Sequence, residues 1–484
     1  MSSSNALERQ TVRRIASIAN CEITAVGTRE SPRDIHAEVE APSLPPPDHG
    51  RQAYLVLLGC TLIQAPIWGN RYVCLVFLCI LINIIGYSLS FGVFQGYYTT
   101  SPASPFFAVD SAFVATVGTT LNGLMYLMMP ITFTVLTRYP GLRPYCGSTG
   151  LLIATASLIM SSFATHIWQL LVCQGILGAI GSGLLFAPTT LYLDEWFIAR
   201  KGIAYGTLWA GKALAGCIFP FLMSSLLLRF GACTTLRIWA ISLVIITSPL
   251  LVTLKPRIPH STATARRPLD WRFLKITSFW MLQVGNICQA LGYLLPTTYL
   301  TSYAHDLGLP RLTGAILIAV CSLGSVLGSL VTGFLNDRLT PTTVILLSSL
   351  GSTLAVLIFW GLSSGIALLS VFAIFYGFFA GGFSSTYPGI LHEMRKEDRN
   401  VDTGLVMGLL LGGRGIGFLM SGPVSGGLMK SALGEGGTLG YDTQYGPIIV
   451  ATGVTALFGS WGWMWKMLGA VMALTQREVK SSSP

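Results

Sequence analysis

A glycine-rich apolar stretch near residue 410 contains a single arginine, and its pattern occurs a second time earlier in the chain. The stretch lies in an apolar run over residues 403–429, long enough for a spanning helix, which needs about 20 residues. Arg414 therefore falls near the middle of a bilayer, where a charge costs about 3 kcal/mol and must face a cavity or a partner. The positions that match at an offset of 202 are Gly202 and Gly404, Gly206 and Gly408, Gly211 and Gly413, and Lys212 and Arg414.

A second match supports this internal repeat. At an offset of 200, Gly181 and Pro188 correspond to Gly381 and Pro388. Two related halves, each with a cation at mid-depth, are typical of transporters built from repeats. The repeat therefore predicts a carrier with its site at the midplane.

Composition supports a membrane protein and excludes several other classes. Of 484 residues, 52% are hydrophobic and only 10% are charged, against about 25% charged in soluble domains. The net charge of +10 does not indicate nucleic-acid binding, because most lysines and arginines lie in short loops beside apolar runs. The ten cysteines form no Cys-x-x-Cys pair and the six histidines are isolated, so we expect no disulfide framework, metal site or cofactor.

The spacing of apolar runs predicts an all-α membrane protein with twelve helices in two pseudo-symmetric six-helix bundles. A long run at residues 54–98 is followed by eleven shorter runs. Loops after the even-numbered spans carry 14 lysines and arginines, and the alternate loops carry 4. This bias predicts that the even-numbered loops and both termini are cytosolic. The predicted parts are a disordered cytosolic tail (1–52), the first bundle (53–254), a basic cytosolic loop (255–276), the second bundle (277–473) and a cytosolic tail (474–484).

A charged turn ends the eighth span. Gly333, Asp337 and Arg338 form a Gly-x-x-x-Asp-Arg pattern at the predicted cytosolic face. There the aspartate can cap the N-terminus of a neighbouring helix, whose dipole favours a negative charge. The equivalent turn of the first half, at Thr137 and Arg138, lacks the aspartate. A gating contact is therefore expected in the second half.

Several further segments carry a resemblance to a known family. They are Asp48-His-Gly50, Ser90-Phe-Gly-Val-Phe-Gln95, Gly175 to Gly183, Asp194-Glu-Trp196-Phe197, Arg200 to Gly206, Phe378 to Ser385, and Gly413-Arg414-Gly415. With the Gly-x-x-x-Asp-Arg turn, the chain resembles the fungal monocarboxylate-transporter-like branch of the major facilitator superfamily. The resemblance implies a twelve-helix carrier of small organic anions, vitamins or secreted metabolites. Animal relatives that carry lactate have an Asp and an Arg in span 8 and a Lys in span 1, and this chain has neither feature.

Lys212 and Arg414 are the leading candidates for substrate binding. The alternative for each is a cation that bonds helix carbonyls or extends toward the interface, although mid-helix position argues against the latter. Two cations without a midplane carboxylate favour an anionic substrate. The secondary candidates are Asn122, Gln174, Gln283, Asn286 and Gln289. Gln283, Asn286 and Gln289 form one polar stripe, which hydrogen bonds between helices explain about as often as substrate contact.

We therefore expect a transporter of a small, monocarboxylate-like organic anion that works by alternating access. The alternative within this class is efflux of a secondary metabolite. From another class, a non-transporting membrane sensor would show a long soluble domain, and an enzyme would show clustered Asp, His or Cys at a membrane face. Neither is found in the sequence. The expected partners are an anionic small molecule and the bilayer, with protons as a candidate coupling ion; the expected location is the plasma membrane.

One segment conflicts with this topology and gives the first prediction. The run at 54–98 is about twice the length of a span, and residues 71–87 account for the excess. Arg71-Tyr-Val73 can be encoded with a common intron start, and the Ile-Ile-Gly-Tyr at 84–87 can contain an intron end. We expect this stretch to be a retained in-frame intron, so the mature transcript should lack it. Sequencing the transcript tests this, and a message that keeps the codons for Val73 to Ile85 would contradict it.

Overall fold

The computed structural model divides into two units, Met1–Leu44 and Pro45–Pro484. All residues described below belong to the second unit. They are residues 47–48, 50–68, 93–94, 97–98, 101, 104, 106, 111–257, 269–397, 401–430 and 439–468. These residues are helical or in turns and connections, with no strand among them. The stretch at 71–87 lies outside this set.

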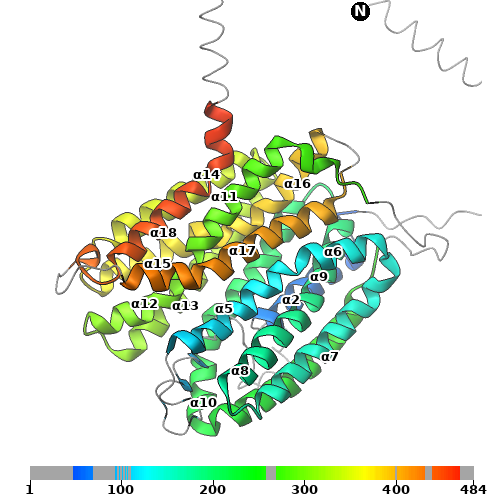
Figure 1. The fold of residues 1–484 in the computed structure, drawn as a ribbon. Coiled ribbons are helices and arrows are strands. Elements are labelled where there is room, and N and C mark those ends of the chain that lie inside the picture. The colour runs from blue at the N-terminus through cyan, green and yellow to red at the C-terminus, as the bar shows by residue number, and fades with distance from the viewer. Residues whose placement is uncertain are drawn as a thin grey trace, which may run out of the picture. The chain divides into compact units, whose positions relative to one another are not determined.

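The helices of the first half pack with one another and, through α5, α6 and α10, with helices of the second half (Figure 1). They are α2 (Arg51–Trp68), α5 (Ser111–Leu127), α6 (Met129–Arg138), α7 (Arg143–Ser161), α8 (Ile167–Leu170), a π-helical segment η2 (Leu171–Leu177), α9 (Gly178–Trp196) and α10 (Lys201–Thr253). A straight helix of 53 residues would be about 80 Å long, far more than the ~30 Å hydrocarbon core. Gly231, with φ 73° and ψ 172°, breaks it into two helices. The positive φ favours glycine, which has no Cβ to clash.

The second half contains the remaining helices, with α14, α15 and α18 on the far side from α7 and α8 (Figure 1). They are α11 (Thr277–Tyr293), α12 (Leu295–Asp306), α13 (Arg311–Asn336), α14 (Pro341–Leu354), η4 (Ala355–Trp360), α15 (Ile366–Gly381), η5 (Gly382–Thr386), α16 (Tyr387–Glu397), α17 (Thr403–Lys430) and α18 (Gly446–Phe458). Three short 3₁₀ turns complete the set, η1 (Pro140–Leu142), η3 (Arg272–Lys275) and η6 (Gly440–Asp442).

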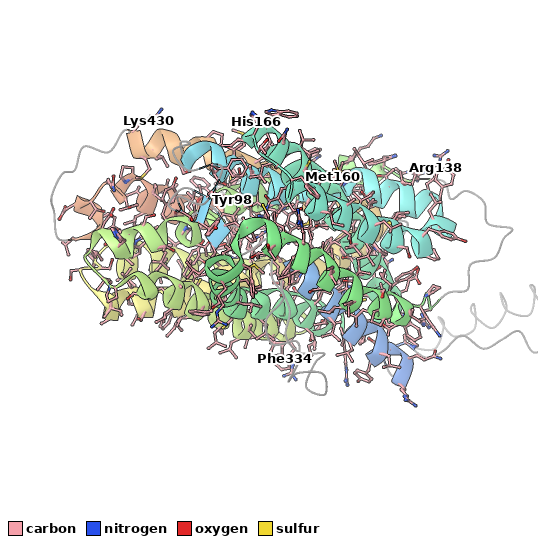
Figure 2. All side chains as sticks on the ribbon, turned by 90° about the horizontal axis from the view of Figure 1, so that it is seen from below. Tyr98, Arg138, Met160, His166, Phe334 and Lys430 are labelled. Atoms are coloured by element: carbon pink, nitrogen blue, oxygen red, sulfur yellow. The ribbon has the colours of Figure 1, made fainter. Side chains whose placement is uncertain are left out.

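The expectation of an all-helical membrane protein is confirmed. Within the described ranges, seven helices are long and apolar enough to cross a bilayer. An eighth span results if the pair Gly446–Phe458 and Trp461–Leu468, bent by 53°, counts as one. Arg138 and Lys430 lie at opposite ends of the molecule (Figure 2), as expected for residues at the two ends of spans. The arrangement of twelve spans as six plus six stays a prediction.

The repeated glycines form two close seams between the halves. In α10, a Cβ on Gly206 would lie 2.6 Å from the carbonyl oxygen of Ser329 in α13. In α17, a Cβ on the matching Gly408 would lie 3.2 Å from the carbonyl oxygen of Met129 in α6. Gly415, outside the repeat, approaches α5 in the same region, since a Cβ there would lie 2.5 Å from the backbone nitrogen of Leu127. Small residues allow this approach, and close packing matters in lipid because no hydrophobic drive brings helices together there. The glycine pattern thus allows close contact twice. We call the contact of α10 with α13 the first seam and the contact of α17 with α5 and α6 the second seam.

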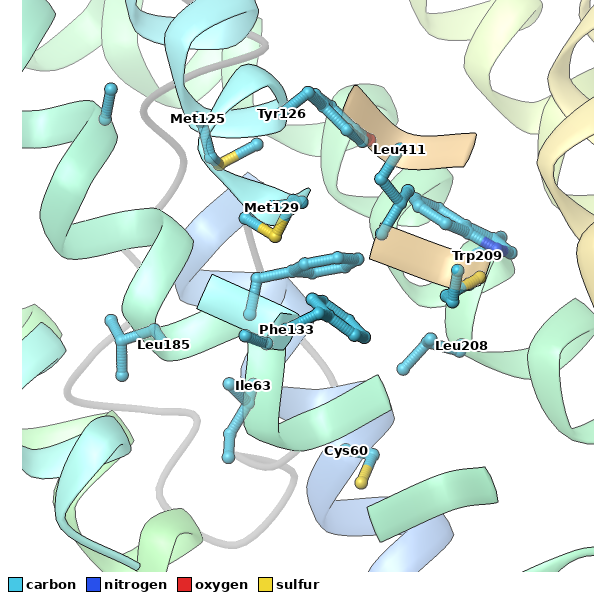
Figure 3. Packing of buried hydrophobic residues seen from close by; sticks show 14 of the residues in the cluster. Cys60, Ile63, Met125, Tyr126, Met129, Phe133, Leu185, Leu208, Trp209 and Leu411 are labelled. Atoms are coloured by element: carbon cyan, nitrogen blue, oxygen red, sulfur yellow. The ribbon is translucent and has the colours of Figure 1, made fainter. Parts of the chain in front are cut away.

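Apolar side chains fill the space beside the second seam. Figure 3 shows Met125, Met129 and Phe133 of the α5–α6 segment in one cluster with Leu208 of α10 and Leu411 of α17. All five are at most 2% exposed. This cluster excludes water from the middle of the interface, so any polar group there must find its partners within the protein.

The seams predict that glycines of one helix differ sharply in their tolerance to substitution. Gly415→Ala should destabilise the protein by about 1–3 kcal/mol, because the added methyl group meets backbone. Gly426→Ala, in the same helix, is the matched control, since a Cβ there meets nothing within 4 Å. Thermal unfolding in detergent measures both. Equal unfolding temperatures for the two variants would contradict the seam.

Candidate functional site

Arg414 lies in the middle of α17 and is 1% exposed. Its Nη1 donates to Gln289 Oε1 at 2.9 Å and to the Tyr387 hydroxyl at 3.5 Å. The ring centroids of three aromatic residues lie between 4.9 and 5.7 Å from its guanidinium carbon: Tyr293, Phe418 and Phe383. Ring faces carry negative charge density and stabilise a desolvated cation by about 2 kcal/mol each in favourable cases. Aromatic rings and two oxygens therefore compensate the buried charge, while its buried Nε has no hydrogen-bond partner among the described residues.

Lys212 lies in α10, in the first half of the chain, and contacts two other aromatic residues, Tyr126 and Trp209. Its Nζ donates to the Tyr126 hydroxyl at 3.3 Å and lies 5.3 Å from the ring centroid of Trp209. The ring of Tyr126 in turn packs edge-on against Phe418 at 5.3 Å, and Phe418 also contacts Arg414. The two cations predicted from the repeat are thus joined through two aromatic rings.

A cavity of about 80 Å³ lies beside Lys212, between α10, α11, α13 and α15. Its walls include aromatic and hydroxyl side chains together with the lysine: Trp209, Lys212, Tyr293, Ser325, Tyr376 and Ser384. Arg414 is not among the residues that line it. Sites for drug-sized ligands measure about 300–1,000 Å³, so this cavity must widen before it can hold an organic substrate.

The polar stripe on α11 mostly makes contacts between helices. Gln283 Nε2 donates to the carbonyl oxygen of Leu409 at 2.8 Å, and Asn286 Nδ2 donates to that of Leu410 at 2.7 Å. Asn286 Oδ1 also accepts from the Tyr387 hydroxyl at 2.8 Å. Together with Gln289, these residues fix α11 and Tyr387 around Arg414. None of the three amides lines the cavity.

The remaining two amides lie elsewhere in the first half. Asn122 Nδ2 donates to the carbonyl oxygen of Gly118 in its own helix at 3.1 Å. Gln174 is fully buried in the π-helical segment η2, and neither its oxygen nor its nitrogen has a partner among the described residues. Neither residue lines the cavity. Their role in substrate binding stays a prediction.

The Gly-x-x-x-Asp-Arg turn joins the halves at one end of the first seam. Asp337 accepts hydrogen bonds from the backbone N–H of Gly202 at 2.7 Å and of Ile203 at 3.0 Å. These are free donors of the first turn of α10, where the helix dipole favours a carboxylate. Burial raises the pKa of the Asp337 carboxyl, and the two N–H donors oppose that rise. Gly333 packs against the backbone of Gly202 in the same place. We call the contact of Asp337 with the N-terminus of α10 the latch.

A second carboxylate, Asp48, binds the connection between α9 and α10, and sequence reasoning missed this contact. Asp48 accepts hydrogen bonds from the backbone N–H groups of three successive residues at 2.9–3.1 Å: Ile198, Ala199 and Arg200. Its φ of 60° places it in the left-handed region. The segment Pro47-Asp48-His-Gly50 carries turn residues, which indicate a turn but cannot identify a partner 150 residues away.

A second contact that sequence reasoning missed links α9 to α17. Asp194 pairs with Lys201 and accepts from the Thr403 hydroxyl at 2.9 Å. Glu195 pairs with Arg143 of α7. Among the contacts at the connection between α9 and α10, the latch and the bond of Asp194 to Thr403 cross between the two halves of the chain. These two contacts therefore join α10 to α13 and α9 to α17 at this end of the molecule.

A helical membrane protein with an internal sequence repeat, two buried cations and a cavity between its helices has the features of a carrier. The chain belongs to the Major Facilitator Superfamily, which it matches over residues 76–394 and 284–478. It is therefore a membrane transporter and not an enzyme. The match begins at residue 76, inside the stretch at 71–87 that we expect to be a retained intron. Sequencing of the transcript remains the test of that expectation.

Curated fungal relatives agree with this family. The chain is 26% identical over 395 residues to the MFS transporter asaE of Aspergillus flavus, covering 81% of this chain and 83% of the relative. It is 28% identical over 413 residues to the aspyridones efflux protein apdF of Emericella nidulans, covering 83% and 77%. It is 25% identical over 346 residues to the fujikurins efflux protein of Gibberella fujikuroi, covering 70% and 69%. The superfamily expectation is confirmed, whereas these names do not support the narrower monocarboxylate branch.

The latch gives a prediction about access to the cavity. Asp337→Asn should weaken the contact with α10, because a neutral amide is a poorer acceptor than a carboxylate. Cys321 lines the cavity and is 5% exposed, so a maleimide should modify it several-fold faster in the variant. Mass spectrometry of the Cys321 peptide gives the rate. Asp306→Asn is the matched control, since Asp306 bonds Tyr445 within the second half; equal rates in both variants would contradict the prediction.

Proposed function

We propose that the protein exports a secondary metabolite with an anionic group and an apolar body. The observation that carries this proposal is Lys212 on the wall of a cavity whose other lining groups are aromatic rings and hydroxyls. An ammonium group attracts a carboxylate or enolate, aromatic walls favour an apolar or conjugated body, and serine hydroxyls accept or donate hydrogen bonds. The names of two relatives, efflux proteins for aspyridones and fujikurins, support export over monocarboxylate uptake.

Transport would proceed by alternating access. The cavity lies along the first seam, between α10 and α13, and the latch closes one end of the same seam. Release of the latch would let α10 and α13 separate and widen the cavity toward that side. We propose that this side is the cytosol and that the membrane is the plasma membrane with both termini inside. The basic loops at this end support the orientation.

We assign different roles to the two cations. Lys212 would contact the substrate anion directly, since it lines the cavity. Arg414 would hold Tyr293 and the α11 amides in place and add positive potential in a medium of low dielectric constant. Arg414 would bind the substrate directly only if the aromatic rings around it moved apart. A small monocarboxylate is the second candidate, favoured by the same pair of cations.

Substitution of the two cations tests the proposal. Lys212→Gln should reduce export of acidic metabolites about tenfold or more, because a charged hydrogen bond contributes roughly 1.5–3 kcal/mol, and Lys212→Arg should keep part of it. Arg414→Gln should abolish transport with the protein still in the membrane. Lys430→Gln, at the end of α17, is the control. Efflux of carboxylated polyketide-type metabolites and uptake of labelled monocarboxylates would be measured in vesicles.

Two results would count against the proposal. Near-normal export by Lys212→Gln would remove Lys212 from the site. Faster transport of labelled monocarboxylates than of every metabolite tested would favour the second candidate.

A further inference from the structure

A second, larger cavity of about 540 Å³ opens at the latched end of the molecule. Its walls come from the connection between α9 and α10, from the end of α13 with the turn that follows, and from α16. We call it the basic cavity, after the basic side chains that line it: Lys201, Arg338, His392, Arg395 and Lys396. It is separate from the cavity beside Lys212, with which it shares no lining residue.

The charges of the basic cavity do not cancel. Arg338, Arg395 and Lys396 form no ion pair with a carboxylate in the described parts of the chain. The two carboxylates on the wall have other partners, since Asp337 accepts from the first turn of α10 and Glu393 pairs with Lys466 at 2.9 Å. The wall therefore carries four lysines and arginines against two carboxylates, and three of these cations form no ion pair among the described residues.

The donors of these cations are only partly used. Arg395 Nη2 donates to the Thr403 hydroxyl at 3.4 Å. The guanidinium carbon of Arg338 lies 4.3 Å from the ring centroid of Phe334, a residue labelled in Figure 2. Each guanidinium has five N–H donors in a planar fork, which suits two oxygens of one phosphate. The volume is within the range of small-molecule sites and accommodates a phosphorylated headgroup with water.

We propose that the basic cavity binds a phosphate group, carried by an anionic lipid headgroup or by a soluble phosphate ester. The bound group would contact Arg338, Arg395 and Lys396 of the second half and Lys201 of the first. Lys201 pairs with Asp194, but its ammonium group has three N–H donors and could donate to both. Since the walls belong to both halves, occupancy stabilises the latched arrangement and slows opening on this side. The site is thus regulatory and distinct from the substrate site.

Binding is tested on the full-length protein in phosphatidylcholine nanodiscs. The probes are inorganic phosphate, inositol trisphosphate and a phosphoinositide added to the nanodisc, with affinity and thermal unfolding as the readouts. A ligand that binds only the folded protein raises its unfolding temperature. We expect at least one probe to bind, Arg395→Gln and Arg338→Gln to weaken binding about tenfold or more, and Arg395→Lys to recover part of the affinity.

Arg138→Gln is the matched control, because Arg138 lies at the end of α6 and does not line the cavity. A response to the phosphoinositide alone supports the site and identifies a headgroup, and a response to the soluble probes alone supports a soluble ester. No response to any probe, or an equal loss in Arg138→Gln, overturns the proposal. Full affinity in a folded Lys201→Gln variant would overturn the bridging role. No transport is measured, so the outcome is independent of the proposed function.

Discussion

A positive charge buried in the middle of an apolar helix that is long enough to span a membrane is the constraint on which the centre of this protein depends. Burial removes the hydration shell of Arg414, which is 1% exposed, so its charge is stabilised by Gln289, Tyr387 and the surrounding rings. Those groups are held in turn by Asn286 and by the close approach of α11 to α17. Removing any partner would leave a buried donor unsatisfied, which costs more than the bond itself contributes. The polar stripe on α11, Gln283, Asn286 and Gln289, therefore serves mainly to position the groups around Arg414.

The close packing of α10 against α13 connects the cavity beside Lys212 to the latch. Along α10, the same helix carries Gly202 at the latch, Gly206 in the seam and Lys212 on the cavity wall. Packed helices move as units and not by continuous deformation, so separation of α10 from α13 at one end alters the spacing beside Lys212. A contact between Asp337 and two backbone N–H groups can therefore control access to a site several helical turns away.

The sequence predicted the kinds of residues at the site better than their roles. Both midplane cations and the Asp337 turn could be found because glycine spacing and a charge in an apolar run are local signals. Lys212 and Arg414 both lie in the expected interior, yet only Lys212 lines the cavity. Asn122 bonds its own helix, and nothing in its sequence position distinguishes that contact from one to a substrate. The relatives also favour efflux over the monocarboxylate function that the two cations suggested.

By itself, the sequence determined the helical membrane class, the repeat and the pair of buried cations, because hydrophobicity, glycine spacing and charge are properties of short segments. Tertiary structure alone decided which helices meet, and with it the pairing of Asp48 with residues 198–200 and of Asp194 with Thr403. It also decided the separation of the small cavity from the basic cavity. These features depend on residues more than a hundred positions apart, and side-chain periodicity within one helix carries no information about its neighbour.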